Sequence, residues 1–93
     1  MLIMLCRNRV QDFEKWKSVF DSHTQFHTDA GLTLLNLWRD ISEPNNVFFI
    51  FKVSNHDKAL EFINFPSSVE AGRVSGVIDG FVHFLVNNRL TEV

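Results

Sequence analysis

The residues best suited to chemistry are two histidines, His23 and His27, separated by four positions in a segment with helical periodicity. Side chains at this spacing project from the same face of a helix, and such a pair can bind a metal ion when a third ligand is near. His83 is the natural third candidate by chemistry, but no His-Glu-x-x-His motif and no acid at ligand spacing is present. So short a pattern more often marks two half-buried polar residues near the open end of the core than a metal site. We therefore predict that no metal is bound.

Acid–base catalysis is the second chemistry open to these histidines. Burial beside aromatic side chains would lower the pKa of an imidazole and leave it neutral, able to accept a proton at pH 7. We predict His23 as the first catalytic candidate and His83 as the second. A histidine on an apolar stripe is more often a hydrogen-bonded core residue, and this structural alternative stays open beside the catalytic one.

The element that must position His23 and His27 is the first helix. Apolar residues recur at steps of three and four from Asp12 to Ala30, which predicts one long amphipathic helix that ends at Gly31. Asn36 is a polar residue among leucines in the following strand. Because a buried amide needs partners, we assign it to a ligand pocket or to a hydrogen bond between subunits. The helix would line this pocket, against the sheet, with Phe13, Trp16, Phe20, Phe26 and His27.

Four strands and two further helices complete the expected fold. The strands are predicted at residues 2–9, 32–41, 47–53 and 81–87. A second helix begins after Ser54–Asp57, and Pro66 starts a third, short one. The order β-α-β-β-α-β predicts a single α+β, ferredoxin-like domain over residues 1–93, with a four-stranded antiparallel sheet and helices on one face.

The third and fourth predicted strands are apolar on both of their faces. In the third strand Phe49 and Phe51 alternate with Phe48 and Ile50, and residues 81–86 show the same property. A strand with one wet face would instead alternate apolar and polar residues. Helices cover only one face of this fold, so the other face needs a second cover. We predict a homodimer through the sheet face opposite the helices.

Composition narrows the classes of function. The chain has ten Phe, two Trp and no Tyr. Because Phe carries no polar group, we expect most of this aromatic surface to be buried. The net charge is −2 and the nine basic residues are scattered, which argues against nucleic-acid binding. No apolar run approaches the roughly 20 residues of a membrane span, and a single cysteine fits a reducing compartment. We expect a cytoplasmic protein with no membrane contact.

Several segments spread over the chain match one known group of proteins. They are residues 12–23, 30–32, 38–40, 44–45, 59–62 and 75–77. Together they resemble the dimeric α/β-barrel superfamily, in particular its small antibiotic biosynthesis monooxygenase-like proteins. The resemblance implies homodimers whose two sheets pack face to face as a barrel, with a pocket between sheet and helices in each subunit. His27 stands where these relatives have Arg, and the catalytic sets of the cofactor-free oxygenases and the haem-degrading enzymes are not carried over.

Two functions follow from the residues and the resemblance. The first is a pocket that binds or transforms a small apolar or aromatic molecule without a bound cofactor, in the manner of a cofactor-independent monooxygenase. The second is a non-catalytic homodimer, either a ligand-binding or a stress-related module. The aromatic stripe with two histidines supports the first, and the lack of a complete catalytic constellation supports the second. Haem binding is a third, supported by superfamily analogy alone.

Overall fold

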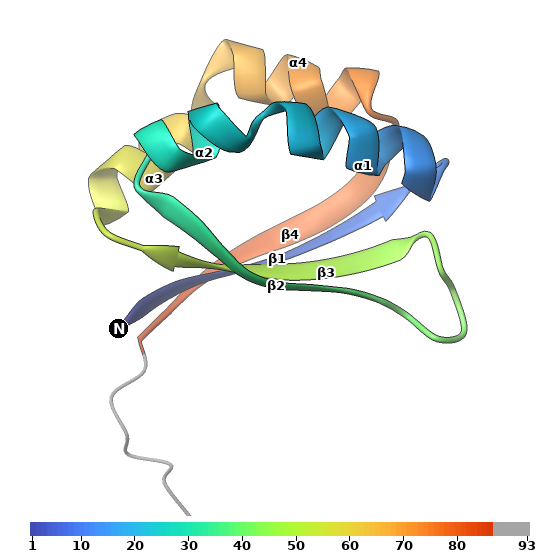
Figure 1. Cartoon of the computed structure of the whole chain (residues 1–93), viewed down its shortest axis with the longest axis horizontal. Coiled ribbons are helices and arrows are strands. Elements are labelled where there is room, and N and C mark those ends of the chain that lie inside the picture. The colour runs from blue at the N-terminus through green and yellow to red at the C-terminus, as the bar shows by residue number, and fades with distance from the viewer. Residues whose placement is uncertain (87–93) are drawn as a thin grey trace, which may run out of the picture.

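The computed structural model describes residues 1–86, which form a layer of helices on a layer of strands (Figure 1). The first helical region is divided in two, and the second is divided at Pro66 as the sequence predicts. The expected end of the last strand at Asn87 lies outside the described residues. The elements are β1 (Leu2–Val10), α1 (Phe13–Ser22), α2 (Thr24–Asp29), β2 (Leu32–Arg39), β3 (Asn46–Val53), α3 (His56–Asn64), α4 (Pro66–Val74) and β4 (Val77–Val86).

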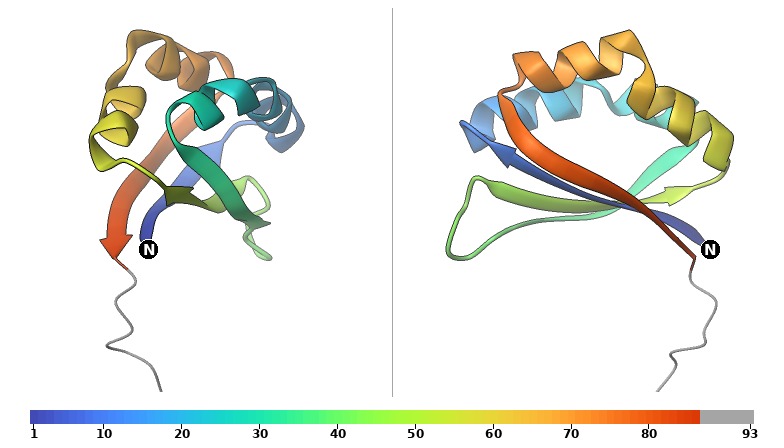
Figure 2. Two further views of the ribbon diagram at one scale, coloured as in Figure 1. Left: turned by 60° about the vertical axis from the view of Figure 1, so that its left-hand side comes forward. Right: turned by 180° about the vertical axis from the view of Figure 1, so that it is seen from behind.

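The sheet has four antiparallel strands in the order β2-β3-β1-β4. Helices α1 and α2 connect β1 to β2, and helices α3 and α4 connect β3 to β4. Figure 2 shows the helices gathered over one face of the sheet. The predicted α+β ferredoxin-like fold is therefore confirmed.

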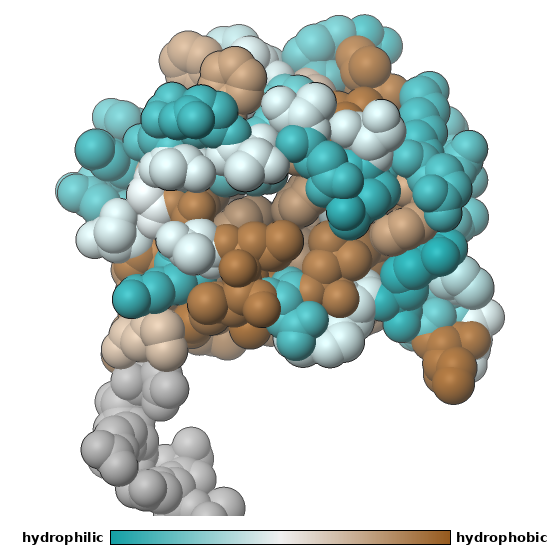
Figure 3. All heavy atoms as spheres, viewed as in Figure 1, coloured by the Kyte–Doolittle hydropathy of each residue, from teal (hydrophilic) through white to brown (hydrophobic). Residues whose placement is uncertain are grey.

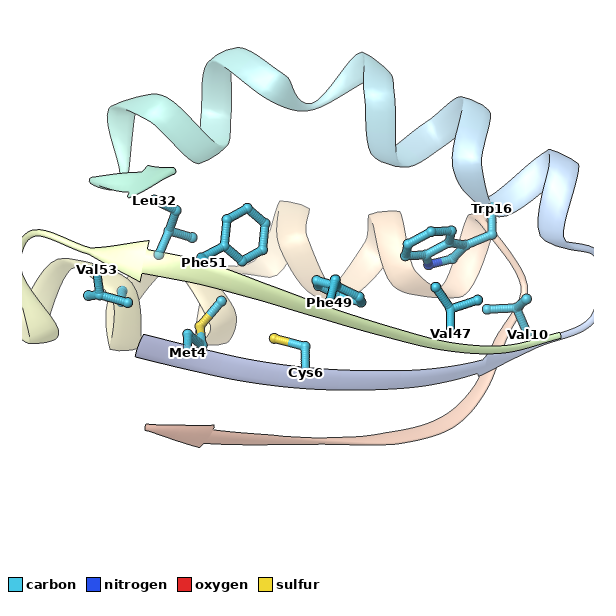
Figure 4. Close-up of a cluster of buried hydrophobic side chains, with 10 residues drawn as sticks. Met4, Cys6, Val10, Trp16, Leu32, Val47, Phe49, Phe51 and Val53 are labelled. Atoms are coloured by element: carbon cyan, nitrogen blue, oxygen red, sulfur yellow. The ribbon is translucent and has the colours of Figure 1, made fainter. Parts of the chain in front are cut away.

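The core lies between the helices and the face of the sheet that they cover (Figure 4). Alternate residues of β1 and β3 point into it, as the two-residue period of a strand requires. Phe51 and Val47 of β3 have exposed fractions of only 2% and 0%. Trp16 of α1 packs onto the sheet, with its ring centroid 5.5 Å from that of Phe49. The rest of the buried cluster is Met4, Cys6, Val10, Leu32, Val53 and Ala59.

The uncovered face of the sheet is also apolar, so the expected two-sided apolarity of β3 and β4 is confirmed. Leu5, in the middle of β1, pairs with Ile50 of β3 on one side and with His83 of β4 on the other. Trp38 is 46% exposed and Phe81 37% exposed, which is high for such large apolar side chains. Figure 3 shows hydrophobic side chains gathered along the sheet layer, below helices whose visible outer surface is mostly hydrophilic.

The first helical region is not the single long helix that the sequence predicts. α1 ends at Ser22 and α2 begins at Thr24, with His23 between them. In a continuous helix the backbone N–H of His23 would donate to the carbonyl of Val19, but here it donates to Phe20. The Val19 carbonyl instead accepts from Ser22 Oγ at 2.6 Å and lies 2.8 Å from His23 Nδ1. Side chains that bind nearby carbonyls compete with helical pairing, which explains the break.

The last strand begins at Val77 rather than at Phe81, so Gly80 lies inside the strand. Gly80 pairs with Asn8 of β1, and a Cβ at this position would come within 2.2 Å of the Arg7 carbonyl oxygen. The glycine therefore permits the close approach of two strands. Gly31, in contrast, has a φ of 75° and ends the first helical region as the sequence predicts.

Candidate ligand pocket

A cavity of about 180 Å³ lies between the helices and the covered face of the sheet. Residues of β1, β3 and β4 form its floor, and all four helices contribute to its walls. Figure 4 shows Cys6 and Phe51 rising from the sheet while Trp16 descends from α1. The cavity therefore lies in the space that the sequence predicts for a ligand pocket.

Aromatic rings form one wall of the cavity. Trp16 and Phe20 are neighbours on one face of α1, and their rings stack with centroids 4.8 Å apart. Phe20 meets Phe49 edge-on at 5.2 Å, and Phe49 meets Phe51 edge-on at 5.8 Å. Stacked and edge-on contacts are the favourable arrangements of aromatic pairs. Trp16 and Phe20 thus line the cavity where the sequence predicts them.

His27 of α2 also lines the cavity, where aromatic rings surround it. Its ring centroid is 4.9 Å from that of Phe20, 5.1 Å from that of Phe51 and 5.6 Å from that of Phe62. Burial, with a smaller contribution from His23, lowers the pKa of His27 to about 4. The imidazole is therefore neutral at pH 7 and offers one N–H donor and one acceptor nitrogen.

His23 lies between the cavity and an outer groove lined partly by α3 and α4. Its Nδ1 is 2.8 Å from the Val19 carbonyl oxygen and 3.1 Å from Ser22 Oγ, and its ring lies 5.3 Å from that of Phe26. Because a carbonyl can only accept, the contact with Val19 makes Nδ1 the protonated nitrogen. His23 thereby takes part in the helix break, and its Nε2 is the nitrogen left for a ligand.

His83 and Asn36 are not brought together with His23, because both lie on the uncovered face of the sheet. His83 pairs with Leu5, and its ring lies 4.9 Å from that of Phe81. Asn36 pairs with Ile50 of β3 and is exposed, and its Oδ1 accepts the backbone N–H of Leu37 at 2.8 Å. Neither residue lines the cavity. Any role of His83 or Asn36 would therefore be exerted at the uncovered face.

Phe13 and Phe26 lie outside the cavity lining, contrary to the sequence prediction. Phe13 packs behind Trp16, with ring centroids 6.0 Å apart, and the Arg39 guanidinium carbon lies 3.8 Å from its ring centroid. Phe26 is 57% exposed and lines the outer groove instead. Because a helix turns by about 100° per residue, Phe26 points away from the cavity that its neighbour His27 lines.

Cys6, Asn8 and Phe62 are among the lining residues that the sequence did not predict as site residues. Burial raises the pKa of Cys6 to about 12, so its thiol stays protonated. The side-chain oxygen of Asn8 accepts from Trp16 Nε1 at 3.3 Å, while its nitrogen donates to the Arg7 carbonyl at 3.0 Å. Strand parity could have identified Cys6 and Asn8, since both alternate with Leu5. Phe62 of α3 meets the cavity only through tertiary packing, which no local pattern reveals.

Among residues 1–86, no Asp, Glu, Lys or Arg side chain lines the cavity. Within residues 1–86, no group of three or more His, Cys, Asp or Glu side chains could hold a metal ion. The expected absence of a bound metal stays a prediction.

Among the helices described, none has the length and apolar character needed to span a membrane.

The sequence matches no known family profile and no curated protein. Solved structures match in fold. SnoaB, a cofactor-independent oxygenase from Streptomyces nogalater crystallised as a point mutant, has a TM-score of 0.74 and 14% identity over 99% of this chain and 97% of its own. A protein of Bordetella bronchiseptica, provisionally assigned as an antibiotic biosynthesis monooxygenase, has a TM-score of 0.73 and 14% identity over 92% and 95% of the two chains.

An uncharacterised NIPSNAP domain protein from Burkholderia xenovorans has a TM-score of 0.66 and 14% identity, over 97% of each chain. These matches confirm that the chain has the fold of the antibiotic biosynthesis monooxygenase-like proteins, as the sequence resemblance implied. At such low identities the likeness shows the fold and not the reaction.

Proposed function

We propose that this chain binds a small, uncharged aromatic molecule in the cavity between helices and sheet, without a bound cofactor. The supporting observation is an aromatic lining around a space of about 180 Å³. An apolar cavity of about 150 Å³ is large enough to hold benzene, so a single substituted ring fits here. The three apolar rings of Phe20, Phe49 and Phe51 would contact it.

The electrostatics of the lining favour a neutral ligand over an ionised one. His27 is neutral at pH 7 because its pKa is lowered to about 4, and Cys6 is protonated because its pKa is raised to about 12. In the described part of the chain, no acidic, lysine or arginine side chain lines the cavity. An ionised ligand would therefore be buried without a counter-charge, which is costly.

Thermal-shift titration with single-ring probes tests this proposal. Toluene and phenol should raise Tm in a concentration-dependent way, since a ligand that binds the native state stabilises it, whereas benzoate should not. The Ala71→Leu variant adds volume within the lining and should abolish the shifts. Val69→Leu, on the same helix but 61% exposed and outside the lining, is the matched control. Equal shifts in Ala71→Leu and wild type would contradict binding in this cavity.

Conversion of the ligand is the second candidate function, and the position of His23 favours it. His23 borders both the cavity and the outer groove, and its Nε2 is available as a general base. Chromatography of the ligand after incubation with the protein would detect conversion. If His23 is catalytic, His23→Gln should bind the ligand but lose most conversion. If it is structural, the variant should lose about 1–3 kcal/mol of stability and keep its affinity.

We also propose that two copies of the chain associate through the uncovered sheet face. This face exposes large apolar side chains across several strands, including Trp38, Phe81 and Leu85. At one end, Arg7 pairs with Asp79 at 3.3 Å and donates to Asn46 Oδ1 at 2.6 Å, so its charge would not be buried without a partner. A largely apolar face can pair with itself about a twofold axis.

A further inference from the structure

We propose that His27 is the residue that selects the ligand, and that it selects a neutral phenol by hydrogen bonding to the phenol hydroxyl group. The inference rests on the proposed function, since it names the ligand class and the group that recognises it. It assigns to His27 a specificity-determining role, while the aromatic rings around it provide the apolar contact.

Within residues 1–86 neither ring nitrogen of His27 makes a hydrogen bond, yet no fully buried side-chain nitrogen or oxygen of these residues lacks a partner. The His27 nitrogens are therefore not sealed in the core and must border open space. His27 borders the cavity and also a surface hollow beside β2. A polar group left unpaired beside an apolar cavity is a recognition point for a ligand.

The other polar groups of the cavity are hydrogen-bonded within the protein or lie away from the aromatic rings. Ser75 Oγ donates to a carbonyl of α4 at 3.0 Å, and the Asn8 amide is used by Trp16 and by the backbone. His23 has one ring nitrogen held by the backbone at 2.8 Å. Ser68 lies at the boundary with the outer groove rather than among the rings. His27 alone among these groups combines two uncommitted nitrogens with an aromatic enclosure.

A phenol matches both the His27 imidazole and the rings around it. A neutral imidazole presents one acceptor and one donor, and a phenol hydroxyl can satisfy either of them. A phenol, like a tyrosine side chain, ionises only near pH 10 and so enters as the neutral molecule. Its ring matches the apolar surfaces of Phe20 and Phe51, whose centroids lie 4.9 Å and 5.1 Å from that of His27. A benzoate would bring a charge that this lining cannot pair.

Calorimetric titration of phenol and toluene separates the hydroxyl from the ring, because the two ligands have similar shape. In His27→Phe, which keeps an aromatic wall, the Kd for phenol should rise about tenfold relative to wild type, the usual value of one hydrogen bond. The Kd for toluene should change by less than about twofold, since toluene makes no hydrogen bond. His27→Gln, which restores a donor and an acceptor, should keep phenol within about threefold of wild type.

The controls make each outcome decisive. Ser67→Ala, at an exposed side chain of α4 that lines the outer groove and not the cavity, should leave both affinities unchanged. Equal losses of phenol and toluene in His27→Phe would overturn the assignment of His27 while leaving the cavity as a binding site. Loss of the preference for phenol in His23→Gln but not in His27→Phe would also overturn it. Failure of the wild-type protein to bind either ligand would defeat the proposed function itself.

Discussion

The two faces of the sheet are built from equally apolar strands, but they have different surroundings. On the covered face, Phe49 and Phe51 pack against α1 and are nearly inaccessible, with exposed fractions of 6% and 2%. On the uncovered face, Trp38 and Leu85 are each 46% exposed. The apolarity of a strand therefore indicates that a face will be covered, but it does not indicate whether the cover comes from the same chain. That distinction follows from topology, because this chain places every described helix on one side.

The histidines show the same difference between the two faces. His27 on the covered side is enclosed by three phenylalanine rings, and burial lowers its pKa to about 4. His83 on the uncovered side contacts the ring of Phe81 at 4.9 Å and pairs with Leu5. Residue type alone does not distinguish them. What distinguishes them is which face of the sheet each one adjoins.

The largest expected effect tests the covered face. Phe51→Ala should lower the free energy of unfolding by about 3–5 kcal/mol, because it removes a fully buried ring and leaves a cavity. The loss, measured by chemical denaturation, should be the same at low and high protein concentration. Phe81→Ala on the uncovered face should instead lower stability by an amount that depends on concentration, because it acts on association. A concentration-independent loss in Phe81→Ala would remove this distinction between the faces.

The next prediction concerns association of two copies of the chain through the uncovered face. Wild-type protein should have twice the 10.8 kDa chain mass by size-exclusion chromatography with light scattering. Ile50→Asp, on β3 beside Leu5, should give the mass of one chain, because an unpaired charge in an apolar interface costs several kcal/mol. Ile41→Asp makes the same chemical change at a side chain that is 99% exposed, and its mass should match wild type. A monomeric wild-type protein would refute the homodimer.

Much of the fold could be predicted from the sequence, because the patterns that define it are local. Alternation along residues 47–53 gave the two faces of β3, and Gly31 and Pro66 gave the positions of helix boundaries. The break at His23 could not be predicted from periodicity. It depends on side chains of Ser22 and His23 that bind the Val19 carbonyl, while the apolar stripe continues across it.

The candidate site was predicted only in part, for a related reason. Trp16, Phe20 and His27 share one helical face, so their common placement could be inferred from spacing. The face of the sheet that a strand residue adjoins depends on register with other strands, which spacing within one strand does not supply. His83 and Asn36 were therefore grouped with the pocket, although both lie on the opposite face.

The third prediction concerns pH and the covered face. The pKa of His27 is about 4 in the folded protein, below the value of about 6.5 for an unfolded histidine. Between these values the unfolded chain binds more protons than the folded chain at this residue. The contribution of His27 to the free energy of unfolding should therefore fall as pH decreases from about 6.5 to 4, and it should be constant above this range. We expect a loss of about 1–2 kcal/mol, because solvent screens a partly buried group. Chemical denaturation at pH 7 and pH 4.5 should show a smaller loss in His27→Gln, and an equal loss would contradict a buried neutral imidazole.

The smallest effect concerns unused space beside the cavity. Gly72 of α4 lines the cavity, and a Cβ built there meets no atom within 4 Å. Gly72→Ala should therefore raise the free energy of unfolding by about 0.5–1 kcal/mol, since alanine favours a helix and the methyl group meets no obstacle. Gly80→Ala is the matched contrast, because its Cβ would lie 2.2 Å from the Arg7 carbonyl oxygen and should push β4 away from β1. Thermal and chemical denaturation of the two variants should therefore give changes of opposite sign. A destabilised Gly72→Ala would mean that the space above the covered face is closed in solution, and the volume available to a ligand would be smaller than the cavity described above.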